Sequence, residues 1–421
     1  MTTTIASVPD TCAAAKRASR ALATLGSGVK DAALEAIAAA LLEHTEEILE
    51  ANARDVEAGK AAGLSSALVD RLTLDEHRVA AMAAGVRKIA SLADPVGEVI
   101  DGHRLSNGLD VRKVRVPLGV IAVVYEARPN VTIDAAALCL KSGNAIVLRG
   151  SSSAAHSNAV LAVVAADAAV AAGLPEGSVS LATGGGREEL AELATQTGVL
   201  DLIIPRGGEG LKAALKGVAT VPVIYAASGN CHIYVDATAD LEAAQAIALN
   251  AKLQRPGVCN AAETLLVHAA VADAFLPGVL GALGEAGVVL HGDERARRAA
   301  PEIAMVPAVE ADWDAEYLAL ELAVGVVDSV DGAIEHINAH GSGHSEAIVT
   351  NDTDAARAFQ LGVDAACVYV NASTRFTDGY EYGMGAEIGN STQKLHARGP
   401  IGLRELCSFK YLVEGAGHIR S

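Results

Sequence analysis

The feature that most constrains the fold is a regular alternation of strand-like and helix-like runs between residues 117 and 228. Apolar runs such as "GVIAVVYEARP", "AIVLRG" and "LDLIIPRGG" alternate with helical runs such as "TIDAAALCLKSGN" and "REELAELATQT". This alternation predicts a parallel sheet with helices on both faces, an architecture typical of nucleotide-binding proteins. The chain is therefore expected to be an α/β protein.

A second block begins near Gly229 with an alternation of its own, from "HIYVD" through "ETLLVH", "LAVGVVD" and "EAIVTN" to "CVYVNAS". Residues 11–95 have apolar side chains at helical spacing, which predicts successive helices. Residues 100–116 alternate polar and apolar side chains across Asn107-Gly108, which predicts a β-hairpin. The C-terminal "LCSFKYLVEG" is strand-like, and it either extends a sheet or pairs with the hairpin of a neighbouring subunit.

Composition excludes several classes of protein. A net charge of −18 over 421 residues argues against nucleic acid or an anionic membrane as a partner. The longest apolar run, "VLAVVAADAAVAAGL", is interrupted by Asp167 and is too short for a membrane span. The six cysteines form no CxxC pair and have no regular spacing, which indicates free thiols in a reducing compartment. A cytoplasmic location is expected.

Cys259 is the cysteine with the least ordinary position. In "QRPGVCNAAETLLVH", Arg255-Pro256-Gly257 stops a helical run, and a strand-like run follows Cys259 within a few residues. A core cysteine usually lies inside an apolar element, whereas a turn can hold a thiolate near backbone amides. Composition favours a structural thiol and position favours a nucleophile, so the residues alone leave both roles open.

Glycine and serine clusters at strand ends suggest anion sites. No GxGxxG motif follows the first strand of the αβ block, but Gly207 and Gly208 close a strand beside Arg206 and open a helix. Their amides predict either a phosphate site or a tight turn without a ligand. At another strand end, Arg149 and the hydroxyls from Ser151 to Ser153 suit a ribose phosphate or form a solvated loop.

Three histidines at four-residue spacing, His336, His340 and His344, look like a metal ladder on a helix. Gly341 and Gly343 are expected to end the helix after His340 and take the third histidine off that face. Without a carboxylate or cysteine at ligand spacing, no metal site is predicted.

Several long stretches together resemble the γ-glutamyl phosphate reductases (glutamate-5-semialdehyde dehydrogenases), a branch of the aldehyde dehydrogenase superfamily. "QRPGVCNAAETLLVH" resembles the family's nucleophile segment. Five further stretches also resemble sequences of this family: "VVDSVDGAIEHINAHGSGHSEAIVT", "VYEARPNVT", "LIIPRGG", "VYVNASTRFTDG" and "GAEIGNSTQKLHARGPIGL". The resemblance runs from about residue 10 to the C-terminus.

The resemblance implies an aldehyde dehydrogenase-like fold with two parallel-sheet αβ domains and a small oligomerisation hairpin. The NADPH-binding domain is expected over residues 1–99 and 117–228, and the catalytic domain over 229–390. Residues 100–116 and 391–421 are expected to form the oligomerisation element of a homodimer or homotetramer. A transient complex with glutamate 5-kinase is a further expectation, because that enzyme makes an unstable acyl phosphate.

The resemblance also assigns roles to single residues. Cys259 becomes the nucleophile, and the Asn130 amide, with the Cys259 backbone N–H, holds the oxyanion. Ser152 stands where NAD-preferring relatives have a glutamate, which suits the 2′-phosphate of NADPH. The predicted cofactor-binding residues are Arg149, Ser151, Ser152, Arg206, Gly207, Gly208 and Glu316, the last on the nicotinamide ribose.

The implied reaction is the NADPH-dependent reduction of L-glutamyl 5-phosphate to L-glutamate 5-semialdehyde through a Cys259 thioester. It is the second step of proline biosynthesis from glutamate. Ala226 stands where hydrolytic relatives carry a water-activating glutamate, which favours phosphate over water as acceptor. Arg255 and Arg375 are candidates for the substrate α-carboxylate, although Arg375 equally suits a structural salt bridge. The alternatives are a hydrolytic or CoA-acylating aldehyde dehydrogenase and a non-catalytic scaffold that has kept the fold.

Overall fold

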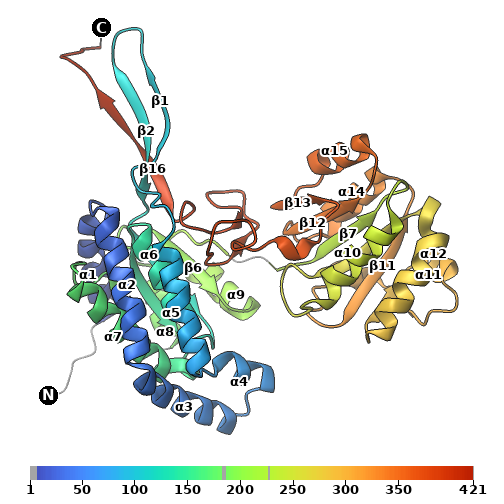
Figure 1. The fold of residues 1–421 in the computed structure, drawn as a ribbon, viewed down its shortest axis with the longest axis horizontal. Helices are drawn as coiled ribbons and strands as arrows, with labels where there is room; N and C mark the ends of the chain where they lie inside the picture. The colour runs from blue at the N-terminus through green and yellow to red at the C-terminus, as the bar shows by residue number, and fades with distance from the viewer. Residues whose placement is uncertain (1–6, 183–185, 226–227, 421) are drawn as a thin grey trace. The chain divides into compact units, whose positions relative to one another are not determined.

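The structure, a computed structural model, describes residues 7–182, 186–225 and 228–420, and the chain divides into two compact units. The first unit comprises Met1–Tyr225, Gly383–Gly389 and Ile401–Ser421. The second comprises Ala226–Tyr382 and Asn390–Pro400. Each unit contains its own parallel sheet, which confirms the predicted α/β class (Figure 1).

The sheet of the first unit has the order β5-β4-β3-β6, and all neighbouring strands are parallel. Its strands are β3 (Val120–Tyr125), β4 (Ala145–Gly150), β5 (Val179–Leu181) and β6 (Leu202–Arg206). β3 is buried along its whole length, as expected for a strand covered on both faces. The strand order reverses between β3 and β6, so their carboxyl ends form the crevice in which open α/β sheets bind ligands.

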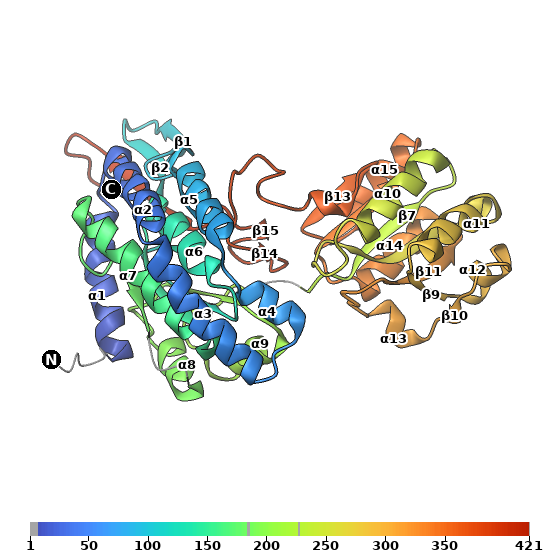
Figure 2. The same ribbon diagram turned by 60° about the horizontal axis from the view of Figure 1, so that its bottom comes forward.

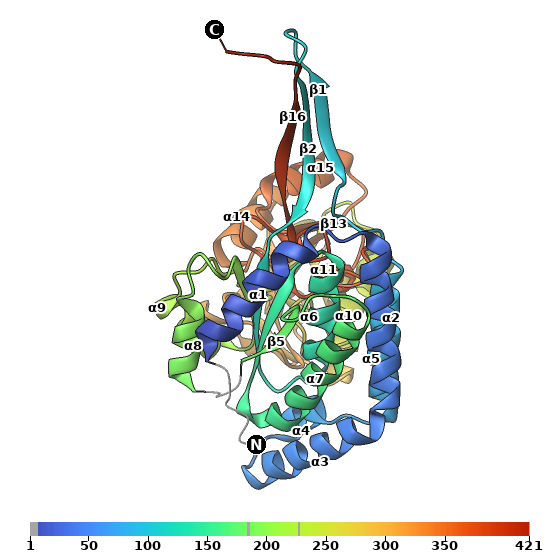
Figure 3. The same ribbon diagram turned by 90° about the vertical axis from the view of Figure 1, so that its left-hand side faces the viewer.

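Helices cover both faces of this sheet. Figure 3 shows α6 and α7 on one side and α1 and α8 on the other. A run from Ser152 to Ala171 is long and apolar enough to span a membrane by length and composition, but α7 packs against α2 and α3 as a core helix does. The helices of this unit are α1 (Val8–Leu22), α2 (Ser27–Glu43), α3 (Thr45–Ala61), α4 (Ser66–Leu72), α5 (Glu76–Ala90), α6 (Asn130–Lys141), α7 (Ala155–Ala171), α8 (Arg187–Ala194) and α9 (Glu209–Val218), with a 3₁₀ turn η1 (Ser152–Ala154).

The predicted hairpin is formed by β1 (Val99–Arg104) and β2 (Asp110–Pro117), joined across Asn107-Gly108. Gly108 has φ +97°, which explains why a glycine follows the asparagine in this turn. The C-terminal strand β16 (Cys407–Glu414) pairs antiparallel with β2 of the same chain. The side chains of β1, and those of β16 beyond Cys407, are exposed.

The second unit contains a seven-stranded parallel sheet in the order β10-β9-β11-β8-β7-β12-β13. Two hydrophobic cores lie on its two faces: one contains Ile233, Leu265 and Val267, and the other contains Tyr234 and Leu266. Successive residues of one strand thus enter opposite cores, because side chains alternate across a sheet. This accounts for the continuous apolar runs in the sequence.

The strands of this unit are β7 (Cys231–Val235), β8 (Ala262–His268), β9 (Val289–Gly292), β10 (Val306–Pro307), β11 (Glu321–Val327), β12 (Ser345–Val349), β13 (Cys367–Val370) and the short antiparallel pair β14 (Asn390–Ser391) and β15 (Gly399–Pro400). Its helices are α10 (Leu241–Leu253), α11 (Ala269–Glu285), α12 (Glu294–Ala299), α13 (Glu310–Trp313), α14 (Val330–His340) and α15 (Thr353–Gly362), with a 3₁₀ turn η2 (Thr374–Phe376).

The unit boundaries differ from the predicted domains near the C-terminus. Residues 383–389 belong to the first unit, and residues 390–400 belong to the second. The pairing of β14 with β15, marked in Figure 2, closes the 390–400 segment on itself. Lys394 and Arg398 both form ion pairs with Asp364, which ties this segment to the second unit.

Candidate functional site

Cys259 lies in the turn between α10 and β8, at the amino end of the second unit's sheet. None of the six cysteines forms a disulfide, and Cys259 is the one that is not buried. The helix ends at Leu253, and the Ala261 amide donates to the Val258 carbonyl at 3.0 Å, so a tight turn carries the thiol. This placement is that of a partly accessible thiol on a fixed turn.

The turn is fixed by the close approach of Gly229. A Cβ atom at Gly229 would lie 1.5 Å from the carbonyl oxygen and 2.5 Å from the Cα of Cys259, so only glycine fits. The same Cys259 carbonyl accepts a hydrogen bond from the Cys231 Sγ at 3.2 Å. The segment that leads into β7 therefore holds the backbone of the candidate nucleophile.

Glu316 joins this cluster through Gly229, because the Gly229 amide donates to Glu316 Oε1 at 2.6 Å. The neighbouring Leu318 has φ +54°, and its amide donates to the Glu263 carboxylate at 3.2 Å. Glu316 thus lies on a loop that is tied to both ends of the Cys259 segment.

A buried ion pair closes the nucleophile segment. Lys252 Nζ lies 2.6 Å from Glu263 Oε2, and both side chains are fully buried. Burial raises the pKa of Glu263 to about 7 and lowers the pKa of Lys252, and each charge partly offsets the effect on the other. The pair joins the last turn of α10 to the start of β8, on either side of Cys259.

The two arginines predicted for the substrate carboxylate lie beside Cys259. Arg375 donates from Nε to Gln254 Oε1 at 2.7 Å. Burial lowers the pKa of Arg375, the charge of Arg255 lowers it further, and the interaction with Cys259 opposes that change. Asn260 fixes the arrangement, because its Nδ2 donates to the Thr377 carbonyl at 2.9 Å. Cys259, Arg255 and Arg375 therefore form one cluster.

In the first unit, Asn130 is the first residue of α6 and is exposed. Its side-chain amide donates to Asp134 Oδ2 at 3.0 Å, one helical turn further on. Burial raises the pKa of Asp134 to about 6, against the opposing effects of this hydrogen bond and of the Arg206 charge. Asn130, Asp134 and Arg206 thus lie at the carboxyl edge of the sheet, at the switch point between β3 and β6.

The turn at Gly207 and Gly208 has an acidic neighbour. The Gly208 amide donates to Glu126 Oε2 at 3.1 Å, and a Cβ at Gly207 would lie 2.7 Å from the carboxyl carbon of Glu126. The amide at the start of α9, where the sequence predicts a phosphate, therefore already donates to a carboxylate. A phosphate at this turn has to displace Glu126.

Arg149 and the predicted serines follow β4. The Arg149 guanidinium donates to the Gly186 carbonyl at 3.0 Å and lies 3.5 Å from the Glu189 carboxylate. Arg149 is 8% exposed, and its Nε has no hydrogen-bond partner. The hydroxyls of Ser151 and Ser153 lie 2.6 Å apart, and Ser152 begins the 3₁₀ turn η1. Arg149 Nε already faces the Glu189 carboxylate, so an anion that binds at this strand end shares the Arg149 charge with Glu189.

The histidine ladder breaks where the sequence predicts. α14 ends at His340, and His344 lies beyond it. Burial lowers the pKa of both His336 and His344 to about 4. Within residues 7–182, 186–225 and 228–420, no group of three or more His, Cys, Asp or Glu side chains is placed to hold a metal ion.

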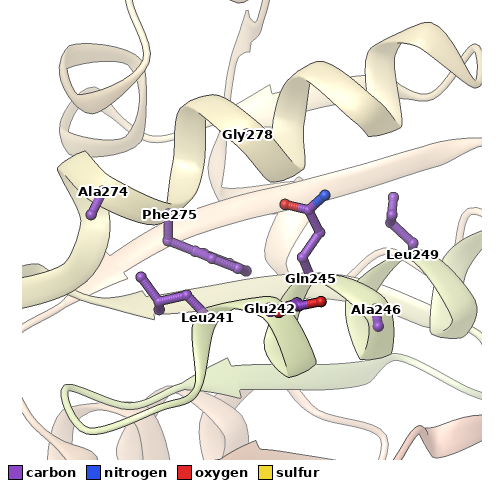
Figure 4. A pocket seen from close by; sticks show the side chains of 8 residues that line it. All are labelled: Leu241, Glu242, Gln245, Ala246, Leu249, Ala274, Phe275 and Gly278. Carbon is purple, nitrogen blue, oxygen red and sulfur yellow. The ribbon is translucent and has the colours of Figure 1, made fainter.

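Two hollows of the second unit contain none of the predicted site residues. Figure 4 shows an apolar groove between α10 and α11, lined by Leu241, Leu249 and Phe275. A polar cavity at the end of α14 is lined by Glu346 and Lys394, among others.

The structure therefore groups the predicted residues in two sets, each within one unit. The second unit contains Cys259, Arg255, Arg375 and Glu316, and the first contains Asn130, Arg149, Ser151, Ser152, Arg206, Gly207 and Gly208. Ala226, expected to replace a water-activating glutamate, lies outside the described residues.

Four residues that shape these sets were not predicted from the sequence. Gly229, Asp134 and the pair Lys252–Glu263 contact predicted site residues or close the segment that carries them. The spacing of Asn130 and Asp134 on one helix face was the only signal available for any of them.

Comparisons with known proteins give one consistent answer. The sequence model of the aldehyde dehydrogenase family matches residues 2–312. A γ-glutamyl phosphate reductase from Moorella thermoacetica is 58% identical over 406 residues, which cover 96% of this chain and 97% of that protein. One from Thermobifida fusca is 56% identical, with the same coverage of both chains.

Solved structures agree with the sequence comparisons. The crystal structure of γ-glutamyl phosphate reductase from Thermotoga maritima has a TM-score of 0.97 and 46% identity, and covers 99% of this chain and 100% of that one. An acetylating aldehyde dehydrogenase from Geobacillus thermoglucosidasius, 19% identical, has a TM-score of 0.68 over 98% of this chain and 97% of that one, and shares the fold.

Proposed function

The chain belongs to the γ-glutamyl phosphate reductases of the aldehyde dehydrogenase family, and on that basis we propose that it reduces L-glutamyl 5-phosphate to L-glutamate 5-semialdehyde with release of phosphate. This is the second step of proline biosynthesis from glutamate. The observation that carries the proposal is the partly accessible Cys259 thiol on a turn that Gly229 holds, in a chain similar to these reductases over 96% of its length.

The family implies a nicotinamide cofactor, and the residues of the first unit fit its phosphate groups. Arg149 is a buried cation that forms an ion pair with Glu189, and the hydroxyls of Ser151 and Ser153 follow the same strand. A guanidinium matches phosphate oxygens, and Ser152 adds no negative charge. We therefore propose NADPH as the cofactor, with Arg149, Ser151 and Ser152 near its adenosine ribose and Glu316 on the nicotinamide ribose.

The turn at Gly207 and Gly208, beside Arg206, is a second proposed phosphate contact. Because Glu126 already accepts the Gly208 amide, a bound phosphate meets a like charge there. Glu126→Gln is then expected to lower the Kd for NADP⁺ about tenfold, as isothermal titration calorimetry would measure. An unchanged Kd would mean that no phosphate binds at this turn.

The chemistry that we propose starts at Cys259. Its thiolate attacks the acyl carbon of the substrate, a C–S bond forms, and the bond to the phosphate oxygen breaks. A bound reduced nicotinamide supplies the hydride that reduces the resulting thioester. The C–S bond then breaks, which returns the thiolate and releases the aldehyde.

The protein's own groups support each addition step. Negative charge develops on the carbonyl oxygen in both additions, and donors from Asn130 and the Cys259 amide hold it. Loss of one such donor costs on the order of 10²–10³ in turnover. The guanidinium groups of Arg255 and Arg375 stabilise the thiolate and bind the substrate α-carboxylate.

The reverse reaction tests the proposal. Glutamate 5-semialdehyde and NADP⁺ are mixed with the enzyme, and NADPH is followed by its absorbance with and without inorganic phosphate. NADPH formation only with phosphate means that phosphate resolves the thioester. Equal formation without phosphate makes water the acceptor, and dependence on CoA makes the protein an acylating enzyme. No turnover with any acceptor would favour a scaffold.

Cellular context is part of the proposal. We expect a cytoplasmic homodimer or homotetramer in which residues 100–116 and 391–421 mediate assembly, since the side chains of β1 and most of those of β16 are exposed. A transient complex with glutamate 5-kinase would protect the acyl phosphate from water. Sedimentation with and without the kinase measures both expectations.

A further inference from the structure

Asp134 is a carboxylate that the proposed chemistry does not use. It lies on α6, one helical turn after Asn130, and its Oδ2 accepts the Asn130 amide at 3.0 Å. It is partly buried, at the carboxyl edge of the first unit's sheet, where the strand order reverses. Ligands of open α/β sheets bind at this kind of position.

The surroundings of Asp134 leave its negative charge without a salt bridge. Among the residues that the structure describes, no cation forms an ion pair with it. Arg206 acts on it from a greater distance, and burial dominates, raising the pKa of Asp134 to about 6. Carboxylates that are partly withdrawn from water are usually paired with a cation, and an unpaired one at a ligand-binding edge is a position at which the cation of a ligand can bind.

The spacing of Asn130 and Asp134 matches the length of the proposed substrate. The Asn130 amide nitrogen lies 3.0 Å from Asp134 Oδ2, and the two oxygens of a carboxylate are about 2 Å apart, so Asp134 Oδ1 lies within about 5 Å of that nitrogen. In an extended glutamyl chain, four bonds separate the γ-carbonyl carbon from the α-nitrogen, a span of about 5 Å. A γ-carbonyl held at Asn130 therefore brings the α-ammonium group to Asp134.

We propose that Asp134 binds the α-ammonium group of L-glutamyl 5-phosphate and so makes the enzyme specific for an amino-acid substrate. The inference rests on the proposed function and on the role of Asn130 in it. Asp134 accepts hydrogen bonds from the ammonium through Oδ1 while Oδ2 keeps its bond to Asn130.

A purely positioning role for Asp134 is the alternative. In that case the carboxylate serves only to orient the Asn130 amide, and any substrate of the enzyme depends on it equally. Asp134→Asn separates the two roles, because the asparagine Oδ1 still accepts from Asn130 but the negative charge is gone. A charged hydrogen bond is worth about 1.5–3 kcal/mol, which is about 10- to 100-fold in affinity.

The test compares two aldehydes in the phosphate-dependent reverse reaction: glutamate 5-semialdehyde and 5-oxopentanoate, which lacks the α-amino group. For Asp134→Asn, we expect kcat/KM to fall 10- to 100-fold with the amino aldehyde, mainly through KM. With 5-oxopentanoate it should stay within about threefold. The Kd for NADP⁺, measured by calorimetry, should not change. Asp167→Asn removes an exposed charge on α7 and serves as the matched control.

Each other outcome overturns the inference. An equal loss on both aldehydes makes Asp134 a positioning residue for Asn130, and no loss on either removes it from the site. If Asp134→Asn does not fold, Asp134→Ser is expected to show the same selective loss. Phosphate-independent turnover by the wild-type enzyme contradicts the proposed function itself, whereas phosphate-dependent turnover without selective loss contradicts only the role of Asp134.

Discussion

Gly229→Ala is the substitution for which the structure gives the clearest magnitude. The added Cβ would lie 1.5 Å from the Cys259 carbonyl oxygen, whereas real Cβ contacts essentially never fall below 3.0 Å. The Cys259 backbone must therefore move by about 3.0 − 1.5 = 1.5 Å. A shift of about 1 Å at a reacting group costs on the order of 100-fold in rate, so kcat should fall at least 100-fold.

Two assays separate a displaced nucleophile from a damaged protein. The first is the phosphate-dependent oxidation of glutamate 5-semialdehyde, and the second is the rate at which iodoacetamide alkylates Cys259. The proposed NADP⁺ phosphate contacts lie in the first unit, so the Kd for NADP⁺ should change by less than about threefold.

Gly284→Ala is the matched control, because nothing lies within 4 Å of a Cβ built at Gly284 on α11 of the same unit. We expect wild-type kinetics from it. If Gly229→Ala kept kcat within about threefold of wild type and the alkylation rate were unchanged, the claim that Gly229 fixes the Cys259 turn would be refuted.

Three further predictions follow from the same contacts. Cys259→Ala should abolish turnover and leave the Kd for NADP⁺ unchanged, so substantial residual turnover would exclude a covalent mechanism. Glu263→Gln leaves the buried charge of Lys252 without its partner and should lower the free energy of unfolding, measured with urea, by about 3–5 kcal/mol. The double substitution Glu263→Leu with Lys252→Met should keep that free energy close to the wild-type value. Because burial raises the pKa of Asp134 to about 6, the folded chain binds a proton more tightly than the unfolded chain, and stability falls as the pH rises through that range. Asp134→Asn should therefore raise the Tm at pH 8 and not at pH 4; a lower Tm at pH 8 would show a structural role.

The fold was predictable because it depends on local patterns. Strands with apolar side chains on both faces, such as β3, give continuous apolar runs, and the hairpin needs a glycine at position 108. The end of α14 at His340 was equally local, since Gly341 follows at once. Each of these signals lies within a few residues of the element that it predicts.

The details of the site were not predictable in this way, because they depend on contacts between distant residues. Gly208 and Glu126 are 82 positions apart, and nothing in the sequence around Gly208 shows that its amide donates a hydrogen bond to a carboxylate. Gly229 stands 30 positions before Cys259 in the chain, and its need to be glycine appears only when the two backbones are seen in contact. The family resemblance supplied roles for single residues, but not the residues that hold them.

The carboxylates of Glu263 and Asp134 have different partners, and this difference separates a supporting role from a binding role. Next to Cys259, the buried carboxylate of Glu263 has a fully buried lysine as partner and also accepts a backbone amide, so the nucleophile segment is held before any substrate binds. In the first unit, Asp134 has an amide as partner but no salt bridge among the described residues, and its raised pKa is a cost to stability. A paired buried charge is expected to resist movement, whereas an unpaired one gains most from an incoming cation. Neutralising Asp134 is therefore expected to stabilise the protein and weaken substrate binding, whereas neutralising Glu263 is expected only to destabilise it.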